Sequence, residues 1–296
     1  MKIAILVIAA KAPSCLNQLV LLFAGNQDFE IYVHVDNRIE LSWYQSQITV
    51  LPSNVRFLTE RVSVYWGGFS MVHATELLAV AALKDYQTSV LCLISDDSLP
   101  LIPPDTLLSE LHCRPNRLDL TPTLNNPVHL ERYIKYYYLD SLPTCVSPVA
   151  VESRAINADL IATFHQIETL KRRGKYPLEA IWSGSQWWSM SRDRIEPLLA
   201  ELASNDWLRE SLKFSAIPDE FTFHSLYAIQ YRIRVSSLLS PMLADFSSVP
   251  APYVYKSLEQ VGFLAPQKLF VRKISNDHAP LIMKQLRHLW NGDSHT

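Results

Sequence analysis

Acidic side chains follow a buried strand in the first half of the chain. The segment 91–97 is apolar up to Ile94 and then ends in Ser95, Asp96 and Asp97. Carboxylates at the carboxyl end of a parallel strand lie where such sheets bind ribose, phosphate or a metal ion. The two acids are adjacent and lack the D-x-D spacing of paired metal ligands, although either could supply one ligand. A turn capped by Asp explains the same residues, so this segment alone leaves both interpretations open.

A second acidic group follows a proline late in the chain. Pro218 precedes Asp219 and Glu220, and helical spacing continues as far as Tyr231. A carboxylate at such a helix start, facing a cleft, is suited to act as a general base. Acids also interact favourably with the positive end of a helix dipole, which explains the composition without catalysis. We expect a helix over 219–231 whose start carries two carboxylates.

A tryptophan-rich segment surrounds one of only seven glycines. Residues 182–188 contain three Trp, together with Gly184 and Gln186. Flat indole rings stack on the C–H faces of sugars, and a Gln amide both donates and accepts hydrogen bonds. A core strand with buried indoles would give the same pattern, and we expect at least one of the Trp to be such a core residue. The segment nevertheless favours a carbohydrate ligand.

A basic pair, Arg272 and Lys273, is embedded in an apolar run near the C-terminal end. Such a pair can neutralise phosphate, although a solvated strand edge has the same composition. Successive residues of a strand point to opposite faces, so only one of the two would meet a given ligand.

Other kinds of site are excluded by the sequence. The histidines show neither H-x-x-x-H nor H-E-x-x-H spacing, and no G-x-S-x-G, Walker or G-x-G-x-x-G motif occurs. The four cysteines are dispersed, which is typical of reduced intracellular thiols. A net charge of −2 excludes nucleic-acid binding by bulk charge. No apolar run reaches the length of a membrane span, and the apolar segment 3–10 is better explained as a buried strand than as a signal peptide.

The order of apolar segments predicts an α/β fold with a mainly parallel central sheet flanked by helices. In the first half, strands are expected over 3–10, 31–35, 55–58 and 90–94, and helices over 16–24 and 69–85. In the second half, helices are expected over 155–175, 192–202, 207–214, 219–231 and 279–290, with extended chain over 181–190 and 269–274 and a loop over 236–252.

Six segments, taken in this order, resemble the core-2/I-branching β-1,6-N-acetylglucosaminyltransferase family, which also includes peptide O-xylosyltransferases. They are Y-V-H-V-D at 32–36, V-Y-W-G-G-F-S at 64–70, L-I-S-D-D-S-L-P-L at 93–101, G-S-Q-W-W-S-M-S-R at 184–192, P-D-E at 218–220 and L-F-V-R-K at 269–273. Each segment alone is weakly specific, but six segments in this order are strong evidence of the resemblance. The resemblance implies a GT-A-like fold, a UDP-sugar donor, inversion at the anomeric carbon and transfer without a bound metal or other cofactor.

The resemblance also assigns roles to individual residues. Glu220 would be the base, Lys273 would pair with the diphosphate, and Asp36 would lie at the uridine. Around the nucleotide we expect Lys11, Asp36, Trp66, Gly67, Asp97 and Arg272. Around the sugars we expect Glu131, Arg132, Ser185, Gln186, Trp187, Trp188 and Asp219.

One departure from the family pattern concerns the second basic residue that animal members carry upstream of the lysine. Lys256, Arg232 and Arg234 are the candidates for it in this chain. The membrane anchor, stem and paired cysteines of the animal enzymes are also missing. We therefore expect a bacterial-type member that acts in the cytoplasm, at the inner face of the membrane, on precursors of surface polysaccharide.

The expected organisation is a single domain over 1–296, with a nucleotide-binding half (1–115) and an acceptor-binding and catalytic half (116–296). The expected function is transfer of a GlcNAc- or xylose-like sugar to a carbohydrate or glycolipid hydroxyl. Three alternatives remain at this stage: a metal-dependent glycosyltransferase that uses Asp96 or Asp97, a non-catalytic carbohydrate-binding relative, and a nucleotide-sugar hydrolase.

Overall fold

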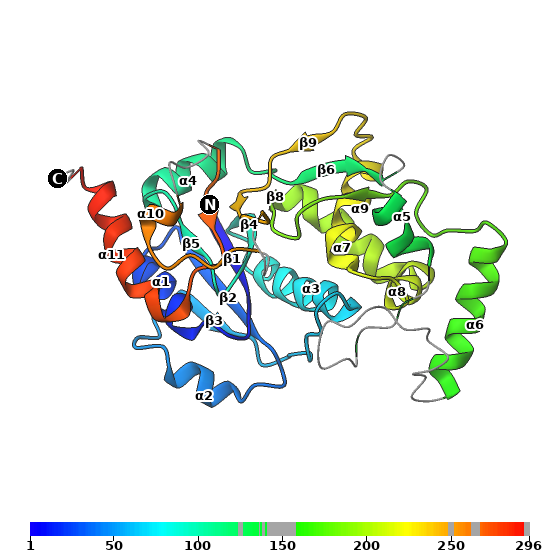
Figure 1. Cartoon of the computed structure of the whole chain (residues 1–296), viewed down its shortest axis with the longest axis horizontal. Coiled ribbons are helices and arrows are strands. Elements are labelled where there is room, and N and C mark those ends of the chain that lie inside the picture. The colour runs from blue at the N-terminus through cyan, green and yellow to red at the C-terminus, as the bar shows by residue number, and fades with distance from the viewer. Residues whose placement is uncertain are drawn as a thin grey trace.

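The computed structural model of the chain (Figure 1) describes residues 1–123, 127–135, 137, 140, 158–247, 252–261 and 267–292.

A five-stranded sheet forms the centre of the fold. Its strands are β1 (Lys2–Ala9), β2 (Phe29–Val35), β3 (Val55–Phe57), β4 (Thr88–Ser95) and β8 (Ser189–Ser191). Their order is β3-β2-β1-β4-β8; the first four run parallel, and β8 pairs antiparallel with β4. β1, β2 and β4 are buried along almost their whole length, which is why they read as continuous apolar runs. The predicted mainly parallel sheet is confirmed.

Helices flank this sheet. They include α1 (Pro13–Phe23), α3 (Phe69–Leu83), α4 (Pro104–Cys113), α7 (Arg192–Ser204) and α11 (Ala279–Trp290). α3 packs against β1, β2 and β4, whereas α1 packs against α11. Figure 1 shows α1 and α11 on one side of the sheet and α3 on the other. This arrangement follows from right-handed crossovers, because the chain moves one way from β1 to β2 and the other way from β3 to β4.

The second half of the chain adds two small sheets. One has the order β10-β11-β5, with β5 (Leu99–Pro100), β10 (Met242–Leu243) and β11 (Phe270–Val271). The other has the order β7-β6-β9, with β6 (Asp119–Pro122), β7 (Trp182–Ser183) and β9 (Ser237–Leu238). The remaining helices are α2 (Leu41–Ser46), α5 (Pro127–Ile134), α6 (Ala158–Arg172), α8 (Asp206–Lys213), α9 (Thr222–Gln230) and α10 (Leu258–Val261).

Two predictions about the second half were wrong. The helix expected over 219–231 is divided: Pro218–Glu220 forms a separate 3₁₀ turn, and α9 begins only at Thr222. The division occurs because Phe221, with φ −139° and ψ −19°, leaves the helical backbone. The stretch 236–252, expected to be a loop, contains β9 and β10. The start of the helix predicted at 155 lies outside the described residues.

The core has two main parts. The larger surrounds the central sheet, and a smaller one joins α1, α11, β5 and β11, with Leu99, Val271 and Ile282 fully buried. Cys15, Cys92 and Cys113 are free thiols. Across the described residues, no helix combines the length and the apolar character that crossing a bilayer requires.

Candidate functional site

The strand order reverses beside β1, since β2 lies on one side of it and β4 on the other. Parallel sheets bind ligands at such a switch point, outside the carboxyl ends of the strands. Lys11 follows β1, Asp36 follows β2, and Asp96 and Asp97 follow β4, so the predicted side chains meet at this one edge. β11 brings a distant segment to the same edge, because the antiparallel pairing of Val271 with Leu99 carries the next residues toward Asp97.

Asp96 is a structural residue of this edge. Its Oδ2 accepts hydrogen bonds of 2.8 Å from the backbone N–H groups of Ala10, Lys11 and Ala12 and from the Tyr44 hydroxyl. Burial and the neighbouring Asp97 raise the pKa of Asp96, whereas the donors from the β1–α1 turn and from Tyr44 lower it. The carboxylate therefore fixes the turn that carries Lys11.

Asp97 is paired with an arginine. Arg272 Nε lies 3.3 Å from Asp97 Oδ1 and donates to Ser95 Oγ at 3.0 Å. The Arg272 guanidinium also lies over the Trp187 ring, 4.8 Å from its centroid. A cation held by a carboxylate and an aromatic face has a fixed position, so Arg272 joins the C-terminal segment to the switch point.

Lys273 lies at the same edge and is half-buried. Its neighbour Ile274 donates from its N–H to Asp97 O at 2.8 Å. Burial lowers the pKa of Lys273, Arg272 lowers it further, Asp97 raises it, and Lys11 lowers it. Neither Lys273 nor Lys11 forms an ion pair with another described residue. An anion at this edge would therefore meet two lysines that form no ion pair within the described part of the chain.

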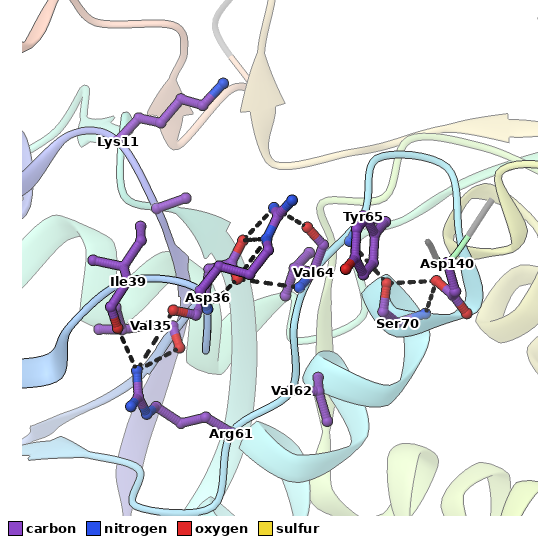
Figure 2. A network of polar contacts seen from close by, with 12 residues as sticks. Lys11, Val35, Asp36, Ile39, Arg61, Val62, Val64, Tyr65, Ser70 and Asp140 are labelled. Atoms are coloured by element: carbon purple, nitrogen blue, oxygen red, sulfur yellow. Dashed lines mark hydrogen bonds and ion pairs between the residues drawn. The ribbon is translucent and has the colours of Figure 1, made fainter. Parts of the chain in front are cut away.

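The residues predicted as sources of a second positive charge are Lys256, Arg232 and Arg234, and all three are exposed. Lys256 directly follows Tyr255, whose N–H donates to Lys273 O at 2.8 Å. None of them is among the charges that act most strongly on Lys273, whereas Lys11 is. Figure 2 shows the Lys11 side chain extending outside the polar network around Asp36.

Asp36 is buried and bound by a neighbouring arginine. Arg38 Nε lies 3.1 Å from both carboxylate oxygens of Asp36. Val64 N donates to Asp36 Oδ1 at 3.3 Å (Figure 2). Burial raises the pKa of Asp36, but the hydrogen bonds from Arg38 and Val64 outweigh it and leave the pKa lowered. The Arg38 guanidinium lies 4.6 Å from the centroid of the Tyr65 ring. Any ligand at the end of β2 therefore meets Asp36 together with Arg38.

The same network continues to the start of α3. Ser70 Oγ accepts a hydrogen bond from Tyr65 N at 2.9 Å and donates one to Asp140 Oδ1 at 2.7 Å (Figure 2). Ser70 N donates to the same Asp140 oxygen at 3.0 Å. A Cβ at Gly68 would overlap this carboxylate, so glycine at this position lets Asp140 approach the start of α3 closely.

Hydrogen bonds from three separate segments hold the acidic turn Pro218–Glu220. Ile217 N donates to Gly67 O at 2.7 Å, and Ala216 N donates to Arg132 O at 2.8 Å. Gly184 N donates to Glu220 O at 2.9 Å. Ile217 has φ +54°, a left-handed conformation that is an outlier for a β-branched residue. Tertiary hydrogen bonds therefore fix the direction in which Glu220 points.

Glu220 forms a partly exposed ion pair. Arg132 Nη1 on α5 donates to Glu220 Oε2 at 2.6 Å, and the Glu220 side chain is 38% exposed. His129, one turn earlier on α5, lies 2.8 Å from Ser183 Oγ through its Nδ1. Burial and Arg132 lower the pKa of His129, although Glu220 raises it, so its imidazole is neutral at neutral pH. The cluster combines an accessible carboxylate with an arginine and a neutral histidine.

Asp219 has a different environment from its neighbour. It is buried, and its Oδ1 has no hydrogen-bond partner among the described residues. Burial raises the pKa of Asp219, and the nearby Glu220 raises it further. The environment of Asp219 therefore favours its protonated form.

The tryptophan-rich segment lies largely inside the protein. Trp188 is fully buried and packs against Phe223. Its ring therefore belongs to the core, which corrects the prediction that it lies around the sugars. Trp187 is 6% exposed under Arg272, and Gln186 is 8% exposed with its Nε2 unpartnered among the described atoms. Ser185 O accepts a hydrogen bond from His224 Nε2 at 2.9 Å.

Two predicted residues lie apart from these clusters. Glu131 pairs with Lys135 at 2.8 Å on the solvent side of α5, and Trp66 is 59% exposed next to the buried Gly67.

Sequence reasoning missed four residues of these clusters, which are Arg38, Tyr65, His129 and Asp140. Two spacings in the sequence could have indicated some of these residues. Asp36 and Arg38 have D-x-R spacing, and His129 and Arg132 have i, i+3 spacing.

No group of three His, Cys, Asp or Glu side chains suited to a metal ion occurs within the described ranges.

Comparison with known proteins identifies one family. The model of the family described as Core-2/I-Branching enzyme matches residues 3–238, which is most of the chain. No curated protein matches the chain.

Similar solved structures include S. aureus TarS, mouse xyloside xylosyltransferase 1 in its apo form and the apo form of the glycosyltransferase GlyE of Streptococcus pneumoniae TIGR4. TarS is 15% identical over 40% of this chain and 21% of its own, with a TM-score of 0.26. The mouse enzyme is 11% identical over 92% of this chain and 97% of its own, with a TM-score of 0.38. GlyE is 11% identical over 99% of this chain and 64% of its own, with a TM-score of 0.40. At these scores the three structures add no argument to the family match.

The structural role of Asp96 leads to a stability prediction. Asp96→Ala leaves three backbone donors and the Tyr44 hydroxyl without their acceptor. Two of these donors, Ala12 N and the Tyr44 hydroxyl, are buried, and each buried donor left unpaired costs about 1–3 kcal/mol, so we expect a loss of about 2–6 kcal/mol. Urea denaturation measures the change. Asp28→Ala, at an exposed position, is the control and should stay within about 0.5 kcal/mol of the wild type. Equal stability of the two variants would contradict the structural role.

Proposed function

The chain belongs to the core-2/I-branching enzyme family, and from this premise we propose that it is an inverting glycosyltransferase with a UDP-sugar donor. The transferred sugar is of the GlcNAc or xylose kind, and the acceptor is a hydroxyl of a carbohydrate or glycolipid. The proposed setting is synthesis of surface polysaccharide at the cytoplasmic side of a membrane.

The observation that best supports this proposal is the return of Lys273 to the switch point beside Lys11. Carboxylates elsewhere at this edge are already engaged by arginines, since Asp36 pairs with Arg38 and Asp97 with Arg272. Two lysines without an acidic partner among the described residues suit a dianionic group such as a diphosphate.

In the proposed reaction, Glu220 takes the proton of the acceptor hydroxyl. The freed oxygen attacks the anomeric carbon from the face opposite UDP. The bond between that carbon and the diphosphate oxygen breaks, and its electron pair leaves with UDP. Arg132, which donates a hydrogen bond to Glu220 Oε2, orients the carboxylate before it receives the proton.

The leaving group needs positive charge near it as the bond breaks. Lys273 supplies this charge, and Lys11 adds a second cation at the same edge. Arg272 has a supporting role, because its guanidinium is already engaged by Asp97, Ser95 and Trp187.

Removal of the base is the central test. Glu220→Gln preserves the shape and most contacts of the side chain but removes its basicity, and loss of a general base typically costs about 10²–10⁴ in rate. We expect kcat for UDP release to fall by that factor, while binding of UDP measured by calorimetry persists. Glu179→Gln, at an exposed position, is the control with unchanged kcat.

Three results of this test would contradict the proposal. They are near-normal turnover in Glu220→Gln, absence of UDP release with every donor and acceptor tested, and release of free sugar without any acceptor. The last result would identify a hydrolase.

The proposed lysine pair predicts activity without a metal. UDP release should survive EDTA and gain little from added Mn²⁺ or Mg²⁺, because cations of the protein already neutralise the diphosphate. The measurement is a rate in chelator-treated buffer, followed by titration of each ion. A loss in EDTA that Mn²⁺ restores would instead assign a metal-binding role to Asp97.

The two basic residues should differ in their effect on UDP. Lys273→Ala should weaken UDP binding by about ten- to a hundredfold, since a charge-assisted hydrogen bond contributes about 1.5–3 kcal/mol. Arg272→Ala should affect UDP less and stability more, because it loses Asp97 and the Trp187 face. Calorimetry and thermal unfolding separate the two effects, with the exposed Lys284→Ala as the control. Wild-type affinity in Lys273→Ala would mean that the diphosphate is bound elsewhere.

A further inference from the structure

A loop with bulky apolar residues and arginines lies exposed beyond the C-terminal end of α9. We call residues 232–239 the apolar-basic loop. Val235 is 77% exposed, Leu238 is 73% exposed and Leu239 is 46% exposed. Three large apolar side chains exposed within five residues form a patch rather than the scattered single residues of an ordinary surface.

The charge around this loop is positive. Arg232 and Arg234 are exposed on the loop itself. Arg194 of α7 lies beside it, with its guanidinium 4.1 Å from the Tyr231 ring centroid. Arg194 itself pairs with the exposed Asp193 at 3.5 Å, and no ion pair of Arg232 or Arg234 occurs within the described residues. The loop therefore combines apolar side chains with a surplus of arginine.

The fold joins this loop to the acidic turn by a short helix. α9 (Thr222–Gln230) begins two residues after Glu220 and ends two residues before Arg232. At about 1.5 Å per residue, nine helical residues separate the two ends by roughly 14 Å. The loop includes β9, which runs beside β6 (Figure 1). In this pairing Leu238 lies opposite Asp119.

We propose that the apolar-basic loop docks this protein on an anionic lipid surface. Val235, Leu238 and Leu239 would enter the boundary between headgroups and acyl chains, and Arg232 and Arg234 would pair with lipid phosphates. The charge of the loop favours an anionic surface over a neutral one. If the proposed function holds, docking here brings a membrane-anchored acceptor within reach of Glu220.

Vesicle sedimentation tests this docking without any sugar substrate. The wild-type protein should sediment with vesicles of phosphatidylcholine and phosphatidylglycerol in equal amounts and stay in solution with pure phosphatidylcholine. Arg234→Ala should lower the partition coefficient roughly fivefold, and Val235→Ser with Leu238→Ser should lower it further. High salt should weaken binding of the wild type.

Controls separate docking from a loss of fold or from self-association. Leu281→Ser with Leu289→Ser removes two exposed apolar residues of α11 and should bind vesicles like the wild type. Thermal unfolding of each variant should match the wild type, because all substituted side chains are exposed.

Three results would overturn the proposal. The wild type could fail to sediment with the vesicles, or the loop variants could sediment as much as the wild type. The third is a wild-type dimer in sedimentation equilibrium that is lost in the loop variants. Because binding is measured without donor or acceptor, an inactive enzyme that sediments would contradict only the proposed function.

Discussion

The hydrogen bond from Ile217 N to Gly67 O, at 2.7 Å, joins the two halves of the chain at the acidic turn. Ile217 is held in a left-handed conformation, which costs an L-residue about 1–2 kcal/mol. Such a conformation persists where several surrounding contacts fix the same backbone geometry. Here the neighbouring bond from Ala216 N to Arg132 O fixes the other side of the same turn. The direction of Glu220 therefore depends on segments that lie far away in the sequence.

The distribution of charge follows a common rule at the three polar clusters. One acid in each cluster pairs with an arginine: Asp36 with Arg38, Asp97 with Arg272 and Glu220 with Arg132. Arginine suits this role because its planar fork binds a carboxylate at fixed geometry and stays charged when partly buried. In the proposed function, the lysines at the switch point bind the diphosphate. Partial burial makes the Lys273 charge costly, so an anion would gain more from it than from a solvated lysine.

The sequence was sufficient to predict the parts of the fold that local patterns determine. Strands such as β1 and β4 are continuous apolar runs because both faces are buried, and acids at their ends mark the edge of the sheet. The acidic turn could not be predicted, because the break at Phe221 and the left-handed Ile217 come from tertiary hydrogen bonds. Burial of Trp188 could not be predicted either, because an indole in a core strand and an indole in a sugar pocket have the same sequence pattern.

Asp119 of β6 contacts both the tryptophan-rich segment and the chain just beyond the apolar-basic loop. A Cβ at Gly184 would overlap the Asp119 carbonyl, so only glycine lets the tryptophan-rich segment approach this strand and donate its N–H to Glu220 O. The Asp119 carboxylate accepts from Ser240 N at 2.8 Å, just beyond the apolar-basic loop. The pairing of β6 with β9, this carboxylate contact and the Gly184 N–H bond thus connect the loop, β6 and the acidic turn. Because these contacts are short and involve the backbone, a ligand held against the loop would keep a defined position relative to Glu220.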